Sequence, residues 1–178
     1  MSFTLYDAFV PTVRQLLGAL PGVIAKAEQH VADSGCTDAD LIEARLADDM
    51  WPLPWHIRSC WVHSGYALDQ LTGTQFTPDF TQIPESWESM RAMVAEASEK
   101  LAEVTPEQVN DIANRQIDFL LGGETRFTLP GERFLLGFNL PNFQFHATTF
   151  YDILRMKGVP LSKRDYMGNP AGPMFQQR

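Results

Sequence analysis

Four histidines are the residues of this 178-residue chain best suited to proton transfer or metal binding: His30, His56, His63 and His146. His56 and His63 lie seven residues apart, so on a helix they share a side and sit about 10 Å apart along the axis. That separation is too long for both to bind one metal ion comfortably. We expect them to be boundary histidines at the edge of an apolar stripe, each with one side in water.

His146 differs because it shares a predicted helical face with Phe143, Phe150 and Ile153. Its imidazole is therefore expected to point into the protein interior. A buried imidazole needs a hydrogen-bond partner, and burial favours its neutral form. His146 is either a satisfied core histidine or a ligand or catalytic base, and it is the best single candidate for a functional residue.

Two further features could carry chemistry, and each has a simpler structural interpretation. Cys60 lies between His56 and His63 and could form a thiolate pair, but it also falls in the apolar arc of its helix, which favours a small buried side chain. Arg45 and Asp49 lie four residues apart in an irregular segment. They could clamp a substrate, whereas a salt bridge between them would only pin the loop.

Composition excludes several classes of protein. The formal net charge of -8 and the pI of about 4.9 repel phosphate backbones, so nucleic acid is not an expected partner. No Gly-rich phosphate loop, Gly-x-Ser-x-Gly elbow or His-Glu-x-x-His helix occurs. The two cysteines build neither a disulfide scaffold nor a zinc knuckle. With no signal peptide and no stretch approaching ~20 apolar residues, we expect a cytoplasmic protein without a membrane partner.

The elements that must position these residues are predicted to be helices. Apolar spacing gives a long first helix over 5–34, bent or restarted near Pro11, and further helices over 54–73, 83–104 and 142–157. A short helix is capped at Thr105, and alternation around Gly122-Gly123 predicts a β-hairpin that leans on the helices. The expected fold is an all-α bundle with a small hairpin before the last helix, one domain over 1–168 and an extended tail over 169–178.

The last predicted helix is apolar on two sides, since Phe145 lies off its main stripe. A helix that is apolar on two sides needs two neighbours. Either a second copy of the chain or the hairpin covers the second side, and we expect a homodimer.

Three segments of the chain resemble a domain-of-unknown-function branch of the DinB/YfiT-like superfamily. They are Leu5-Tyr6-Asp7 with Val10-Pro11, the run from Arg45 to Met50, and the run from Phe145 to Arg155 followed by Gly158-Val159. The run from Lys163 to Gly168 is similar to that family's closing element. The resemblance covers most of the chain and implies an up-down-down-up four-helix bundle that is often a homodimer.

Well-studied members of the wider superfamily carry a metal on three histidines, one from the second helix and two spaced by four residues on the last helix. Some are thiol-dependent transferases or isomerases. His146 matches one last-helix ligand, and His63 or His56 matches the second-helix ligand. Phe150 and Asn142 occupy the positions four residues either side of His146, so the third ligand is missing. A site with only two protein ligands would hold zinc or nickel weakly. We therefore expect no metal or other cofactor.

The sequence therefore predicts a bundle protein with no assignable reaction, a homodimer with an apolar pocket near His146 that could take a small molecule. The alternative is an enzyme of the superfamily's metal- or thiol-dependent transferase kind, using His146 with His63 or His56. Whether the protein is an enzyme stays open at this point. The candidate pocket residues are His146, His63, His56, Phe150, Arg45 and Asp49.

Overall fold

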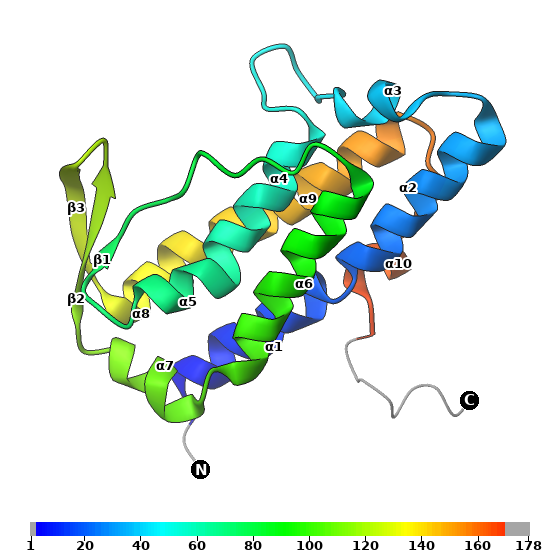
Figure 1. The fold of residues 1–178 in the computed structure, drawn as a ribbon. Helices are drawn as coiled ribbons and strands as arrows, with labels where there is room; N and C mark the ends of the chain where they lie inside the picture. The colour runs from blue at the N-terminus through cyan, green and yellow to red at the C-terminus, as the bar shows by residue number, and fades with distance from the viewer. Residues whose placement is uncertain (1–2, 170–178) are drawn as a thin grey trace.

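The computed structural model describes residues 3–169. Long helices packed side by side form the body, and a small three-stranded sheet lies at one end (Figure 1). The expected all-α class is right in outline, because the fold is mostly helical, but the prediction included only the hairpin and not the third strand of the sheet. Apart from Asn169, the tail expected over 169–178 lies outside the described residues.

The N-terminal helical stretch consists of α1 (Leu5–Leu17) and α2 (Leu20–Ser34). Thr4 caps α1, and its hydroxyl accepts a hydrogen bond from the backbone amide of Asp7. The predicted break falls at Gly18 and not at Pro11, which lies inside α1. Gly18 is a poor helix former, and Pro21 suits the first turn of a new helix, so the chain restarts there.

This stretch has the predicted length but is more apolar than the sequence analysis expected. By length and composition alone Leu5–Ser34 could cross a membrane, with a mean hydropathy of 1.3 over an 18-residue window. Half of that window is buried within the fold, as in a core helix, and a core helix meets the same criterion.

The second long helical segment follows α3 (Asp38–Ile42) and an irregular connection. It runs through α4 (Leu53–Trp61), the π-helical turn η1 (Val62–Tyr66) and α5 (Ala67–Gln70). Its start matches the prediction, but the kink at Ser64 (φ -125°, ψ -106°) was not predicted. The Ser64 hydroxyl donates to the carbonyl oxygen of Cys60 at 2.6 Å, and such competition with the helix ladder favours a bend.

Helix α6 (Trp87–Glu103) and the short α7 (Pro106–Ile112) come next. The predicted cap of α7 is confirmed, because the Thr105 hydroxyl accepts from the amide of Gln108. Helix α6 begins four residues later than predicted, at Trp87, because Ser86 supplies its N-cap.

The predicted hairpin is confirmed as β2 (Gln116–Leu121) paired antiparallel with β3 (Glu124–Pro130). Gly122 and Gly123 form its turn with φ of +64° and +81°, which glycine adopts without strain. A third strand, β1 (Gln75–Phe76), pairs parallel to β2. The alternating pattern could not reveal it, since β1 has only two residues.

The C-terminal part contains α8 (Gly131–Phe134), a second π-helical turn η2 (Leu135–Asn139), α9 (Leu140–Met156) and α10 (Lys163–Met167). Helix α9 confirms the predicted last helix. Helix α10 begins at Lys163, and its Asp165 pairs with Lys26 of α2 at 2.7 Å.

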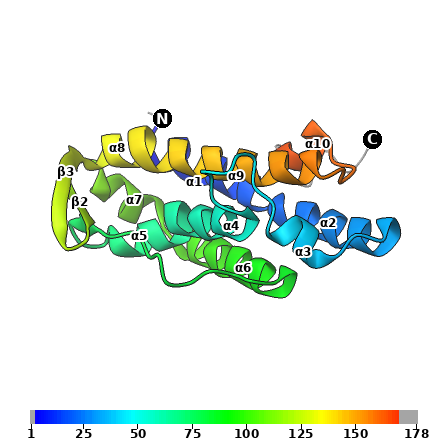
Figure 2. The ribbon, with the colours of Figure 1, turned by 90° about the horizontal axis from the view of Figure 1, so that it is seen from above.

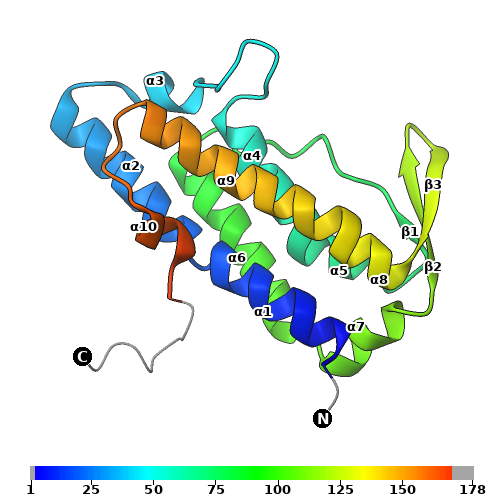
Figure 3. The same cartoon turned by 180° about the vertical axis from the view of Figure 1, so that it is seen from behind.

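Helix α4 lies between α9 and α6, and it contacts both (Figure 2). Figure 3 shows α9 running along α1, with the sheet beyond α8. All residues of α4 are buried except Trp55, which is half-buried. A helix covered on every side belongs to the centre of the protein, and the polar side chains of α4 therefore lie inside it.

Candidate functional site

Three of the four histidines meet between α4, η1 and α9. The Nδ1 atoms of His56 and His146 lie 3.0 Å apart, and the His146 ring is 6.3 Å from the His63 ring, centroid to centroid, with the planes 5° apart. Their exposed fractions are 1% for His56, 7% for His63 and 8% for His146. The prediction that the His146 ring points into the interior is confirmed. The prediction that His56 and His63 have one side in water is wrong.

The error has a physical cause in the segments that cover α4. Trp51, from the connection before α4, stacks on His146 with ring centroids 5.9 Å apart and planes 13° apart. Phe76 of β1 and Phe138 of η2 lie against His63 at 6.0 and 5.7 Å. A helical wheel of α4 contains no information about residues on other segments. Residues at the edge of its apolar stripe were therefore predicted to contact water.

The hydrogen-bond partners of each ring allow an assignment of the nitrogen that carries the proton. His56 Nε2 lies 3.2 Å from the carbonyl oxygen of Trp51, and His63 Nδ1 lies 3.0 Å from Oδ1 of Asn139. Because both oxygens accept, both nitrogens are assigned a proton, and His56 Nδ1 is left as an acceptor. His146 then donates from Nδ1 to His56. This assignment leaves the Nε2 lone pairs of His63 and His146 without a role inside the cluster.

The cluster is uncharged at neutral pH. Burial, assisted by the nearby charge of Arg58 and opposed by the hydrogen bond to Asn139, lowers the pKa of His63 to about 4. Burial likewise lowers the pKa of His146 to about 3, with added repulsion from His56, His63 and Arg58. The pKa of His56 is lowered mainly by burial. Neutral rings of this kind accept hydrogen bonds but take up a full proton reluctantly.

The His63 to Asn139 hydrogen bond joins the two π-helical turns, η1 and η2. Turns of this kind inside α-helices are frequent at functional sites. Asn139 is fully buried, and its Nδ2 has no hydrogen-bond partner. Sequence reasoning missed Asn139 because an amide next to Leu140-Pro141 reads as the start of a helix.

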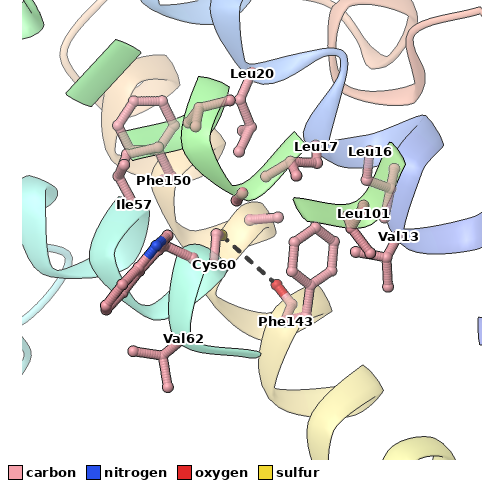
Figure 4. Close-up of a cluster of buried hydrophobic side chains, with 14 of the residues drawn as sticks. Val13, Leu16, Leu17, Leu20, Ile57, Cys60, Val62, Leu101, Phe143 and Phe150 are labelled. Carbon is pink, nitrogen blue, oxygen red and sulfur yellow. Dashed lines mark hydrogen bonds between the residues drawn. The ribbon is translucent and has the colours of Figure 1, made fainter. Parts of the chain in front are cut away.

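Cys60 is a buried core side chain and not a thiolate. Its Sγ lies 3.9 Å from the carbonyl oxygen of Phe143, within the apolar cluster drawn in Figure 4. Burial raises the pKa of this thiol far above its usual range, which keeps it protonated. Phe150 packs in the same cluster and is fully buried, so it contributes to the core.

Arg45 and Asp49 do not join the histidines, and within residues 3–169 they do not pair with each other. Both are exposed, and Arg45 Nη1 donates instead to the carbonyl oxygen of Asp48 at 3.4 Å. The expected pair fails because residues 45–49 are not helical, so a spacing of four does not bring the side chains together.

A surface pocket of about 620 Å³ lies elsewhere, among α5, α6, α7 and the turn after α5. None of its lining residues belongs to the histidine cluster. The apolar pocket expected near His146 therefore stays a prediction. In the part of the chain that the structure describes, no three histidine, cysteine, aspartate or glutamate side chains are grouped to hold a metal ion.

Comparisons with known proteins agree with the resemblance found in the sequence. A family model described as "Domain of unknown function (DUF1993)" matches residues 5–167. A solved structure described as a DinB family member protein from Shewanella denitrificans is similar, with a TM-score of 0.79 and 25% sequence identity. The match covers 93% of this chain and 92% of that chain. No relative among curated proteins matches the sequence.

Proposed function

Because the chain belongs to the DUF1993 family and shares the fold of a DinB family member, we propose that it binds a small molecule at the histidine cluster. One observation supports this proposal above the others. Three buried imidazoles engage one another and nearby oxygens so that two lone pairs are left over. Apolar side chains would fill a site needed only for packing with a smaller loss of stability, because burying polar groups costs free energy.

The two unused acceptor nitrogens determine which polar groups a ligand must carry. Nε2 of His63 and Nε2 of His146 suit a hydroxyl, amide or thiol that donates a hydrogen bond. Their lowered pKa values make them weak bases toward a neutral ligand. A negative charge on the ligand would raise these pKa values and make proton abstraction easier.

Thermal-shift measurements test this proposal. Low-molecular-weight thiols and small apolar compounds are added to the untagged wild-type protein, H146A and H30A, each shown to be folded by circular dichroism. His30 lies on α2, outside the cluster, so H30A controls for the loss of any imidazole. We expect a compound to raise the Tm of the wild type and H30A but not of H146A. Equal stabilisation of all three proteins, or of none, would contradict the proposal.

A second candidate is an enzyme of the DinB superfamily's metal- or thiol-dependent transferase kind, using His146 with His63 or His56. The 3.0 Å between the Nδ1 atoms of His56 and His146 favours it. Two nitrogens on one tetrahedral zinc ion lie about 3.3 Å apart, and metal-bound histidines give their other N–H to carbonyl oxygens, as His56 does.

The donor set does not complete such a site. Phe150 and Asn142 stand four residues either side of His146, where the superfamily resemblance calls for a ligand. We therefore derive no step through a metal ion. Elemental analysis of protein purified without a histidine tag tests this candidate, and near-stoichiometric zinc, nickel or iron would favour it over the first.

We propose a homodimer formed through the outer side of α9. Phe145 is 55% exposed, so the hairpin does not cover it, and Met156 is exposed as well. Light scattering coupled to size exclusion measures the mass of the wild type and of F145E. A monomeric wild type would contradict the dimer. A dimer that persists unchanged in F145E would place the interface elsewhere.

We also propose the up-down-down-up bundle as the plan of the fold. Its four rods are α1 with α2, α4 with α5, α6, and α8 with α9. The cytoplasm is the proposed location, which suits the two free cysteines, Cys36 and Cys60.

A further inference from the structure

Arg58 is the most unusual charged residue in the described part of the chain. It lies on α4, and only 2% of it is exposed. Buried charges in proteins are normally paired with an opposite charge. Within residues 3–169, Arg58 forms no ion pair, and its one hydrogen bond there is a long one, from Nη1 to the Ser59 hydroxyl at 3.4 Å.

The two nitrogens left without a partner are Nε and Nη2. In a guanidinium group, these two N–H groups point the same way and form one edge of the plane. That edge matches the two oxygens of a carboxylate, which it binds through two parallel hydrogen bonds. Nη1, whose position is on the other side, is the nitrogen that Ser59 accepts from.

Two aromatic rings lie beside the guanidinium group. Its central carbon lies 4.2 Å from the ring centroid of Phe80 and 5.7 Å from that of Trp55. Contacts of this kind between a cation and aromatic rings favour the charged form of Arg58. Because Nε and Nη2 are themselves buried, a ligand reaches this edge only after the surrounding side chains move.

Asp79 is the carboxylate whose charge acts on Arg58, but it forms no ion pair with this edge. Asp79, one residue before Phe80, exerts an attraction on Arg58, but its oxygens accept hydrogen bonds from within its own loop. Its Oδ1 accepts from the amide and hydroxyl of Thr81 at 2.6 and 2.8 Å and from the amide of Gln82 at 3.2 Å. The loop between β1 and α6 therefore places Phe80 against Arg58, while Asp79 stabilises the turn of that loop.

We propose that Arg58 binds the carboxylate of a small ligand edge-on, through Nε and Nη2. The surrounding rings favour an acid with an aromatic or other flat apolar body, since Trp55 and Phe80 line the guanidinium and Trp51 lies 6.3 Å from Phe80. The carboxylate takes the place of the missing ion-pair partner.

This inference deepens the proposed function, and it rests on that function only in assigning the acid to the same ligand that the histidines contact. Trp51 connects the two places, because it stacks on His146 and also meets Phe80 edge-on. A carboxylate on Arg58 would offset the charge that helps to keep the pKa values of His63 and His146 low. The acid would thus make the histidines better bases when it binds.

Calorimetric titration with benzoate and with its neutral counterpart benzamide tests the proposal, with sodium chloride holding the ionic strength constant. The wild type is expected to bind benzoate at least about tenfold more tightly than benzamide. R58M keeps a long apolar side chain between the rings and should lose that preference. R58K keeps the charge but cannot form the two parallel hydrogen bonds. Its preference for benzoate over benzamide should lie between those of the wild type and R58M.

Two controls separate the possible outcomes. D79N should bind benzoate as the wild type does. If D79N changes stability or loses benzoate binding in the same way as R58M, Asp79 is the true partner of Arg58. The Nε–H resonance of Arg58 in 15N-arginine-labelled protein should shift with benzoate and not with benzamide. Inorganic phosphate that shifts it as strongly would mean a general oxyanion site and would overturn the carboxylate assignment.

The same titrations on H146A distinguish this inference from the proposed function. Benzoate binding that is lost in R58M but kept in H146A supports the carboxylate site whatever the histidines do. Benzoate binding that is lost in H146A and kept in R58M overturns the inference and leaves the histidine site standing. An Arg58 resonance that benzoate, phenylacetate and acetate all leave in place at millimolar concentration would also overturn it.

Discussion

Acidification to about pH 5.5 should destabilise this protein because of its histidine cluster. In the folded state the pKa values of His63 and His146 are lowered to about 4 and about 3. An unfolded histidine titrates near 6.5. The unfolded chain therefore binds more protons over this range, and the stability that is complete above about pH 6.5 is lost as the pH falls toward the folded values.

The size of the effect follows from the same values. At about pH 5.5 each of the two histidines is almost fully protonated in the unfolded chain and almost fully neutral in the fold. Going from about pH 7.5 to about pH 5.5 then removes about 1 kcal/mol for each ring, or about 2–3 kcal/mol for both. His56 adds a loss of the same sign, since its pKa is also lowered. The lowered pKa values of Asp40 and Asp165 act only at more acidic pH.

Urea denaturation at the two pH values and constant ionic strength measures this loss directly. The informative variant is H63Q, whose amide can still donate to Oδ1 of Asn139 but does not titrate. It should lose about 1 kcal/mol less than the wild type on acidification. H30A, which lacks a histidine outside the cluster, controls for changes in overall charge.

Two results would refute the reasoning. A wild-type free energy of unfolding that is the same at both pH values would show that the rings are not held neutral by burial. A loss in H63Q as large as in the wild type would show that the acid sensitivity comes from other groups.

Three further outcomes follow from the packing. H146A should lower the free energy of unfolding by ~1–3 kcal/mol, because His56 loses its buried donor, and an unchanged Tm would contradict this. G65A should destabilise the protein by more than about 1 kcal/mol, since a Cβ there would lie 2.8 Å from the carbonyl oxygen of Ala97, and a neutral result in urea denaturation would show that α6 yields easily. One thiol, Cys36, should react with Ellman's reagent in the native protein and two in urea, because Cys60 is buried and protonated; two fast thiols in the native state would place Cys60 in contact with solvent.

Local patterns in the sequence were enough to predict the hairpin, the cap of α7 and the inward direction of His146. Each of these depends on a few neighbouring residues, such as Gly122-Gly123 or Thr105 with Gln108. The period of the apolar residues then assigns one side of an element to the core. Predictions of this kind hold because backbone geometry within one element fixes them.

The burial of His56, His63 and Arg58 could not be predicted in the same way. It depends on Trp51, Phe76 and Phe80, which lie on segments outside α4 and meet it only in the folded chain. One weak signal was present, since Arg58 is the only charged residue between Met50 and Leu68 apart from histidines. A helix so poor in charge is typical of the centre of a protein.

The π-helical turns also lay beyond sequence reasoning. Neither Ser64 nor Asn139 marks such a turn, because both residues are equally compatible with a regular helix. Their effect on the site is nevertheless direct, because they carry both partners of the His63 to Asn139 hydrogen bond.

The aromatic cover over α4 has a consequence for the speed of binding. Trp51 packs on His146, and Phe80 packs on Arg58. A ligand that approaches either side chain therefore contacts an aromatic ring before it can bind. The rings must swing aside before it can enter, and this opening is a step of the free protein. In stopped-flow mixing, the observed rate would then rise with ligand concentration only up to a ceiling set by the opening, while a smaller residue in place of Trp51 would lift that ceiling.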